Sequence, residues 1–310
     1  MMLEERSCIQ RGEIMLNGVD IASYQKDMNC QTVDADFIII KVSQGTTYRN
    51  PNLTKQARDT YVAGKLLGLY HYATGCGAIA EADYFLENAK EFLGHAILCL
   101  DWEHNEKGGK NPIFGTAGEV QYCRTFANRI HEKCGLWPFI YMSASVTRRR
   151  DWSYVAEKCP LWVAQYPNYN LTGYKQSPWK DNKGLGAWDK YWKGEKIRQY
   201  SSCGSIKGYV QTEPHKLDLD IAYMTPEEWK KFSNDVDAVV SKPITPAVIA
   251  DVLADKYGSG ASRIQNLAAA GYNAVDVQKK INELHDIAIK KVQPIKNSVG
   301  EYWSSVLDLL

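Results

Sequence analysis

The sequence predicts an α/β protein: a β/α barrel, followed by a small all-α module of three helices and a C-terminal helix. Three observations support this. About eight short apolar segments have the character of buried strands. They alternate with amphipathic helices in the first half of the chain and with loops in the second. In addition, polar residues lie near the C-terminal ends of these predicted strands. Alternating strands and helices imply a parallel sheet, and eight strands favour a closed barrel.

The bulk composition is that of a globular protein with a substantial core. The chain has 310 residues, of which 45% are hydrophobic and 24% charged, and a net charge of +1. That charge balance does not favour nucleic acid or an anionic membrane as a partner. No apolar stretch approaches the roughly 18–20 residues of a membrane span. The eight cysteines are scattered without a C-x-x-C pair, so we expect reduced thiols, no metal site and no cofactor.

The chain divides by composition into five segments. These are a polar N-terminal extension (1–14), a barrel (15–234), a linker (235–244), a helical module (245–284) and a helical tail (285–310). The first segment has no apolar core region, so we expect no secretory signal peptide. The apolar face of the tail either packs internally or pairs with a second chain, which makes a homodimer one candidate assembly.

The predicted elements of the barrel follow in chain order. The strands are expected at 17–25, 36–45, 66–73, 95–101, 138–143, 161–166, 197–200 and 217–223. Helices are expected at 54–64, 78–92 and 118–135, and a last one begins at the capping box of Thr225 and Glu228, with proline at its first position. The nine residues with chemical potential near strand ends are Asp20, Lys41, His71, Asp101, Glu103, Tyr141, Tyr166, Gln199 and Asp218. Barrel enzymes build their sites at that end.

Asp101 and Glu103 form the most informative pair. They follow an apolar run, and side chains alternate along a strand, so both carboxyls are expected on one face. Neighbouring carboxyls resist simultaneous ionisation, which tends to split their pKa values. Acid-assisted cleavage of a glycosidic bond needs one protonated carboxyl and one ionised carboxyl. The alternative is a pair of solvated acids at a strand end.

Residues 16–232 resemble glycoside hydrolase family 25, the Chalaropsis-type lysozymes. The matching segments are Gly18–Ala22 with Gln25, Lys41–Gly45, Gly68–Tyr72, Asp101–Glu103, Pro138–Tyr141, Leu161–Tyr166, Arg198–Tyr200 and Leu217–Asp220. Each segment is short, but together they occur in the order of the family.

The resemblance implies a flattened β/α barrel that hydrolyses the β-1,4 bond between N-acetylmuramic acid and N-acetylglucosamine in peptidoglycan. Glu103 would donate the proton and Asp101 would stabilise or attack the anomeric centre, while Asp20 and Asp218 would complete an acidic floor. The family often has arginine where Lys41 stands, and commonly asparagine at position 220. The extra carboxyl of Asp220 leaves the choice between it and Asp218 open, although Asp218 fits the register better.

The predicted substrate-binding residues share the same strand ends. They are Lys41, Tyr70, His71, Tyr72, Tyr141, Trp162, Tyr166 and Gln199. Aromatic rings suit the C–H faces of sugars, but about half of these rings are expected to be barrel packing. For His71, a role as a site donor and one as a satisfied core histidine carry equal weight.

Residues 245–284 resemble the Cpl-seven type of cell-wall-binding repeat, through Ala250–Leu253, Lys256–Gly260 and Ala269–Tyr272 with Arg263. Gly258, Gly260 and Arg263 are the predicted wall-binding residues, although the glycines could serve only as turn formers. A single copy of the repeat implies weak binding, unless dimerisation adds avidity.

We therefore expect a peptidoglycan muramidase. The lack of a signal peptide suits a phage endolysin that remains in the host cytoplasm until a holin releases it. A bacterial autolysin of the same chemistry and a non-catalytic wall-binding protein are the alternatives. A metal-dependent hydrolase using Asp20, His71, Asp101 and Glu103 is disfavoured, because no paired-histidine motif such as H-E-x-x-H is present.

Overall fold

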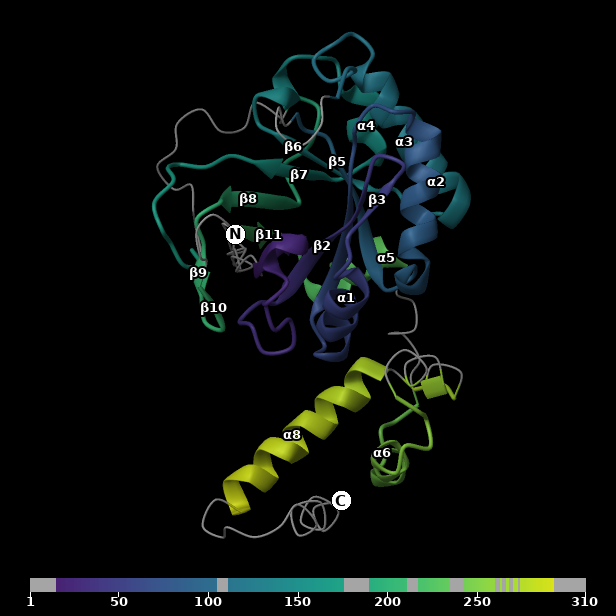
Figure 1. Ribbon diagram of the computed structural model, residues 1–310, viewed down its shortest axis with the longest axis vertical. Helices are drawn as coiled ribbons and strands as arrows, with labels where there is room; N and C mark the ends of the chain where they lie inside the picture. The colour runs from purple at the N-terminus through teal and green to yellow at the C-terminus, as the bar shows by residue number, and fades with distance from the viewer. Residues whose placement is uncertain are drawn as a thin grey trace, which may run out of the picture.

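Eight strands close into a barrel in the computed structural model, which describes residues 15–104, 111–175, 190–210, 217–234, 242–259, 263, 266, 267, 270–272 and 274–292. The strands are β1 (Leu16–Ile21), β2 (Phe37–Gln44), β4 (Leu66–Tyr72), β5 (Ala96–Asp101), β6 (Phe139–Ser143), β7 (Leu161–Ala164), β8 (Ile197–Ser201) and β11 (Asp218–Ala222). They pair in the order β1-β11-β8-β7-β6-β5-β4-β2, and the pairing of β1 with β2 closes the ring. The predicted barrel is confirmed (Figure 1).

Helices cover the outside of the barrel. They are α1 (Leu53–Val62), α2 (Ala78–Ala89), α3 (Glu119–Cys134) and α4 (Ser153–Lys158), with short 3-10 turns η1 (Ser23–Gln25), η2 (Lys90–Phe92) and η3 (Val146–Arg148). Three two-residue strands complete the unit: β3 (Tyr48–Arg49), which pairs with the end of β2, and β9 (Ser205–Ile206) with β10 (Tyr209–Val210). The short α4 and these three strands were not predicted.

One strand departs from the expected parallel arrangement. β11 runs antiparallel to both of its neighbours, β1 and β8, whereas the other barrel strands pair in parallel. In the described part of the chain no helix separates β8 from β11, and only a crossover connection can return a chain to the same direction. The start of β11, with Asp218, therefore lies at the same end of the barrel as the C-terminal ends of the other strands.

Strand alternation divides the hydrophobic core into two layers. On β5, Leu98 and Leu100 face outward to the helices, whereas Ile97, Cys99 and Asp101 face the interior. The outer layer is the larger one and contains the buried faces of α1, α2 and α3. The inner layer fills the barrel with large side chains, so polar chemistry is confined to its open end.

Helix α5 (Pro226–Ser233) closes the opposite end of the barrel. Its start has the predicted capping box, in which Thr225 Oγ1 accepts from Glu228 N and the Glu228 carboxylate accepts from Thr225 N. Trp229 is 1% exposed, donates from Nε1 to Leu67 O at 3.1 Å and lies 4.8 Å from the Phe37 ring. A side chain at Gly18 would meet that ring at 2.4 Å, so glycine is required there.

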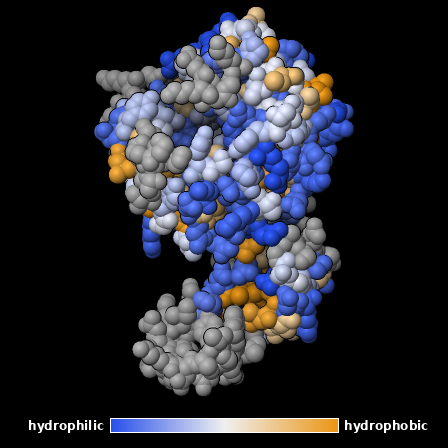
Figure 2. All heavy atoms as spheres, in the orientation of Figure 1, coloured by the Kyte–Doolittle hydropathy of each residue, from blue (hydrophilic) through white to orange (hydrophobic). Residues whose placement is uncertain are grey.

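The C-terminal unit is small and lies beyond the closed end of the barrel (Figure 1). Helices α6 (Pro246–Leu253) and α8 (Ala274–Val292) enclose a core of Val248, Ile249, Val252, Leu267, Val277, Ile281 and Leu284. Hydrophobic side chains gather on its surface just below the barrel, whose own surface is mostly hydrophilic in the same view (Figure 2). Helix α8 runs through the predicted boundary at 284/285 without a break.

Some predicted segments cannot be compared with the structure. Residues 1–14, 235–241 and 293–310 lie outside the described residues. Lys242, at the end of the predicted linker, donates its backbone N–H to Gly271 O at 2.7 Å and so is already part of the C-terminal unit. The seven described cysteines are free thiols and five are buried, as expected for core residues.

Replacing Trp229 with alanine is expected to destabilise the barrel by about 3–5 kcal/mol, because it leaves a cavity and an unpaired Leu67 carbonyl. Urea denaturation followed by circular dichroism measures this free energy. Trp137→Ala, on a partly buried side chain outside the inner layer, is the control and should cost less. Equal losses for the two variants would contradict the role assigned to α5.

Candidate active site

The predicted acid pair lies at the open end of the barrel. Asp101 ends β5, faces the interior and is 6% exposed, and Glu103 follows two residues later in a half-buried position. Trp102, between them, is fully buried and faces the outer layer, where its ring lies 5.0 Å from Tyr122. The structure therefore brings the two carboxyls to one side, the arrangement expected from strand alternation.

A buried carboxylate outside the barrel fixes the segment that carries the pair. Glu119, the first residue of α3, accepts from Trp102 Nε1 at 3.3 Å and from Gly115 N at 3.1 Å. Arg149 binds both of its oxygens, at 3.0 and 2.6 Å, and Arg150 lies 3.4 Å away. Sequence reasoning missed Glu119, because its arginine partners follow about 30 residues later on another element.

Lys41 brings the positive charge nearest to the acid pair. Its ammonium donates to Gln44 Oε1 at 2.8 Å and lies 4.5 Å from the centre of the Tyr72 ring and 6.0 Å from that of Tyr70. The register between β2 and β4 shifts just after Lys41, which re-aims the end of β2. Burial lowers the pKa of Lys41, while the charges of Asp101 and Glu103 oppose that shift.

Burial makes both acids hard to ionise. It raises the pKa of Glu103 to about 7, with a further contribution from the charge of Asp20. Burial and the neighbouring Glu103 charge raise the pKa of Asp101 well above its usual range, and Lys41 lowers both values. The pair therefore retains a proton near neutral pH.

Gln199 organises the second half of the site. Its Nε2 donates to Asp20 Oδ2 at 2.6 Å, and its Oε1 accepts from Tyr141 Oη at 2.8 Å and from Tyr166 Oη. Gln199 and Tyr141, both predicted to bind substrate, are thus buried and hold Asp20 in place. Burial raises the pKa of Asp20 to about 6, while the hydrogen bonds from Gln199 and Asp220 lower it.

The predicted aromatic residues divide into core and rim. Tyr70, Tyr141 and Trp162 pack edge to face in the inner layer, with ring centroids 6.3 and 4.6 Å apart, and Tyr72 is also buried. Tyr166 is half-buried and meets Tyr169, which is 70% exposed, at 5.9 Å. Tyr169 was not predicted, and it offers the most accessible ring beside the site.

Both candidates for the last acid face the interior, at different depths. Asp218 begins β11, is half-buried and pairs in register with Asp20. Asp220 is fully buried, accepts from Trp162 Nε1 at 2.8 Å and is hydrogen-bonded to the Asp20 carboxyl. The predicted set therefore omitted Asp220. The sequence contained a signal for it, because side chains two residues apart on a strand lie on the same face, and Asp218 and Asp220 are two residues apart.

The structure places His71 away from the site, which corrects its assignment as a substrate-binding residue. It lies on β4 between Tyr70 and Tyr72 and therefore faces the outer layer. Its Nδ1 pairs with Ser43 Oγ at 2.9 Å and its Nε2 with Glu81 Oε2 at 2.8 Å. Burial lowers the pKa of His71 against the opposing effect of Glu81. His71 is a satisfied core histidine, so the metal-ligand set that included it is not assembled.

The described residues give no further indication of a metal or membrane role. No group of three or more His, Cys, Asp or Glu side chains among them is arranged to hold a metal ion. Within the same ranges, no helix combines the length and the apolar character needed to cross a bilayer.

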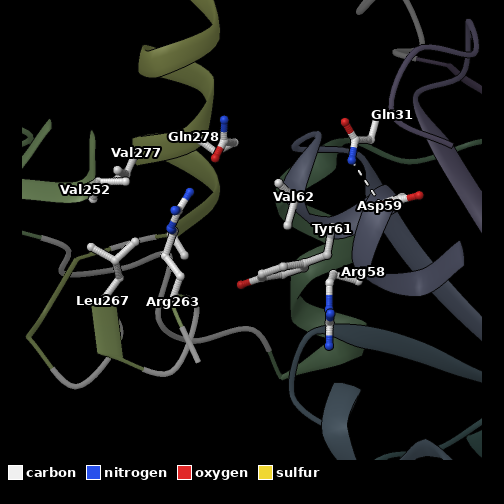
Figure 3. A pocket seen from close by; sticks show the side chains of 11 residues that line it. Gln31, Arg58, Asp59, Tyr61, Val62, Val252, Arg263, Leu267, Val277 and Gln278 are labelled. Atoms are coloured by element: carbon white, nitrogen blue, oxygen red, sulfur yellow. Dashed lines mark hydrogen bonds between the residues drawn. The ribbon is translucent and has the colours of Figure 1, made fainter. Parts of the chain in front are cut away.

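One of the predicted wall-binding residues, Arg263, lies beside a cavity of about 170 Å³ between α1 and the C-terminal unit (Figure 3). Arg263 lines it together with Leu267, and Tyr61 extends from α1 toward them. Arg263 Nε donates to Gly258 O at 2.8 Å, where Gly258 has a φ of +73°. Gly260 lies outside the described residues.

Removing the charge of Lys41 should raise the pKa of Glu103 above about 7, because the ammonium favours ionised carboxyls. We expect Lys41→Met to move the Glu103 midpoint upward in a pH titration of its carboxyl carbon by NMR. Lys65→Met is the control, since Lys65 lies at the closed end, bound to Val33 O and Ala35 O. A midpoint that is unchanged or lower in Lys41→Met would contradict this electrostatic account.

Comparison with known proteins agrees with the motifs and the geometry. The profile of glycosyl hydrolases family 25 matches residues 19–209, and that of the CW_7 repeat matches residues 247–284. An N,O-diacetylmuramidase from Chalaropsis sp is 32% identical over 144 residues, which is 42% of this chain and 67% of the relative. The lysozyme of Streptococcus phage Cp-7 is 28% identical over 277 residues, covering 86% of this chain and 69% of the phage protein.

A solved structure shows the same fold. The family GH25 lysozyme from Aspergillus fumigatus superimposes with a TM-score of 0.55 at 26% identity, over 71% of this chain and 99% of that one. These matches confirm the resemblances noted in the motifs. With its acid pair at the mouth of an eight-stranded barrel and a matching profile over most of that barrel, this chain belongs to glycosyl hydrolases family 25.

Proposed function

We propose that this glycoside hydrolase is a muramidase that cleaves the β-1,4 bond between N-acetylmuramic acid and N-acetylglucosamine in peptidoglycan. The observation that carries the proposal is the placement of the Asp101 and Glu103 carboxyls on one side of the chain at the open end of a family 25 barrel. Relatives named lysozyme and N,O-diacetylmuramidase support the substrate class.

The difference in exposure between the two acids supports a division of their roles. Glu103 is the more exposed acid, so a glycosidic oxygen can reach it, and Glu103 protonates the leaving oxygen. Asp101 lies deeper and ends β5 on the interior face, from which its carboxyl stabilises the anomeric centre. Positive charge developing on the sugar favours ionised Asp101, and Lys41 assists in the same direction. Substrate thereby shifts the proton toward Glu103.

The acidic floor and the rim support the substrate. Asp20, held by Gln199, adds negative charge beneath the forming oxocarbenium ion. Asp218 lies opposite Asp20 and nearer the solvent, where it adds to the same field. Tyr166 and Tyr169 form an aromatic corner at the rim on which a sugar face can stack.

The repeat serves to attach the enzyme to the wall. Its profile match and the position of Arg263 beside a cavity support this role. A single repeat gives a weak contact, and homodimerisation through residues 285–310 would add avidity. Within that segment only residues 285–292, the end of α8, are described.

The biological setting we propose is host lysis by a phage. The likeness to the phage Cp-7 lysozyme, which extends across both the barrel and the repeat, supports an endolysin role. The protein would then accumulate in the host cytoplasm and reach the wall after a holin opens the membrane. An autolysin of the same chemistry is the alternative, and the genomic neighbourhood of the gene distinguishes the two.

Glu103→Gln is expected to reduce the rate of peptidoglycan cleavage by about 10²–10⁴-fold, because the amide cannot protonate the leaving oxygen. Borohydride reduction of the digest followed by mass spectrometry identifies the new ends, which should be reduced N-acetylmuramic acid. Glu87→Gln, at an exposed position on α2, is the matched control. Normal activity in Glu103→Gln, or reduced N-acetylglucosamine ends, would refute the proposed acid or the proposed bond.

Arg263→Ala in the full chain is expected to lower the fraction of protein that sediments with purified cell walls. Arg58→Ala removes a guanidinium that lines the same cavity from the barrel side and should have a smaller effect. The assay uses catalytically inactive Glu103→Gln as the background, so that wall digestion does not interfere. Unchanged sedimentation of the Arg263 variant would remove Arg263 from the wall-binding site.

A further inference from the structure

Two carboxyls meet below the acid pair, and the mechanism above uses only one of them. Asp20 lies on β1 and Asp220 on the adjacent, antiparallel β11. Their register pairs Asp20 with Asp218 and Gly18 with Asp220, so Asp20 and Asp220 are diagonal neighbours on the interior face. Asp220 is fully buried.

The hydrogen bonds around Asp220 require a proton. Its Oδ1 accepts from Trp162 Nε1 at 2.8 Å. Its Oδ2 is buried and meets no N–H or hydroxyl donor of the described residues, and the neighbouring Asp20 carboxyl is within reach of a hydrogen bond with the Asp220 carboxyl. Asp20 Oδ2 accepts from Gln199 Nε2 at 2.6 Å. Two ionised carboxylates are both acceptors, so one of the two groups must be protonated for them to bond.

Among the described residues, no cation lies where it would stabilise two charges on Asp20 and Asp220. The titratable groups that interact electrostatically with Asp220 are Asp20 from β1, Asp218 from its own strand, Cys99 from β5, Tyr200 from β8, and Tyr166 and Tyr174 from the segment after β7. None of them is cationic. In the described part of the chain neither Asp20 nor Asp220 forms an ion pair with lysine, arginine or histidine. A buried charge left without a partner is strongly unfavourable.

We propose that Asp220 is a neutral carboxylic acid in the working enzyme and donates its proton to the Asp20 carboxylate, which makes it a positioning residue for Asp20. Burial and the charge of Asp20 both raise the pKa of Asp220 well above its usual range. The consequence of this arrangement for catalysis rests on the proposed function, whereas the protonation state of Asp220 is independent of it.

Stability as a function of pH tests the protonation state without any assay of activity. An unfolded aspartate has a pKa of about 3.9, so above that pH the unfolded chain releases a proton that native Asp220 keeps. The wild type must therefore lose stability relative to Asp220→Asn as the pH rises toward the native pKa. The ratio of their unfolding equilibrium constants should change by about tenfold per pH unit between pH ~5 and ~7.

Urea denaturation of both full-length proteins, followed by tryptophan fluorescence, measures that ratio. Asp27→Asn, at an exposed position, controls for the loss of one carboxyl from the chain. A ratio for Asp220→Asn that stays constant over this pH range would mean that native Asp220 is ionised, and would overturn the proposal.

Two substitutions at position 220 then distinguish the loss of a hydrogen-bond donor from the loss of a charge. Asparagine keeps an N–H donor at position 220, so peptidoglycan cleavage and its pH profile should stay close to those of the wild type. Leucine removes the donor and should lower the rate by about tenfold, the effect of one lost hydrogen bond, and shift the acidic limb of the profile. An inactive but folded Asp220→Asn would show that the charge of Asp220, not its proton, is required.

A titration of the wild type covers the case in which a variant fails to fold. With carbon-13 in the aspartate carboxyls, NMR at pH ~7 should show the assigned Asp220 signal in the neutral-acid position. An Asp220 signal in the ionised position would overturn the proposal. If the wild type did not cleave peptidoglycan at all, the proposed function would fail, while the stability and NMR results would still decide the state of Asp220.

Discussion

The burial of several like charges beside one cation is the constraint on which the site depends. Asp20, Asp101, Glu103 and Asp220 lie at the open end of a closed barrel, and Lys41 is the cation associated with them. Four ionised carboxyls with one ammonium would cost more than the fold can tolerate, so protons must remain. A retained proton beside an ionised partner is what general acid catalysis requires. The burial that makes ionisation of these carboxyls unfavourable is therefore also what keeps a proton available for general acid catalysis.

The buried acids outside the barrel differ from those of the site, because hydrogen-bond donors and cations surround them. Glu119 is fully buried but holds two arginines, and Glu81 accepts from the backbone N–H groups of Thr74 and Cys76 and pairs with His71. Burial raises the pKa of Glu81, but these bonds outweigh it and the net shift is downward. Buried acids of the outer layer thus have donors that stabilise their charge. The interior acids have mainly one another, and this contrast separates structural carboxyls from reactive ones.

Period-two alternation accounts for most of what could be predicted from the sequence. It placed Asp101 and Glu103 together, while short apolar runs placed the eight strands within a few residues of their observed bounds. Applied to the neighbouring strands, the same alternation also places His71 outside, between the inward Tyr70 and Tyr72, and Asp220 inside with Asp218. The sequence analysis left both of these choices open, although the period of the strand contained the signal.

Other features depend on contacts that local pattern does not contain. The antiparallel direction of β11 follows from a connection without a crossover helix. The ion pair between Glu119 and Arg149 joins α3 to a residue beyond β6. The hydrogen bond from Gln199 to Asp20 joins residues that are 179 positions apart in the sequence, one on β8 and the other on β1. Only the closed ring of strands brings such residues together.

A neutron crystal structure at pH ~7 would test this electrostatic account most directly, because it locates protons on individual oxygens. The account predicts two deuterons on the carboxyls of Asp20, Asp101, Glu103 and Asp220, one shared by Asp101 and Glu103 and one between Asp20 and Asp220. Four ionised carboxylates, with their charge balanced by a bound cation or by ordered water, would contradict it.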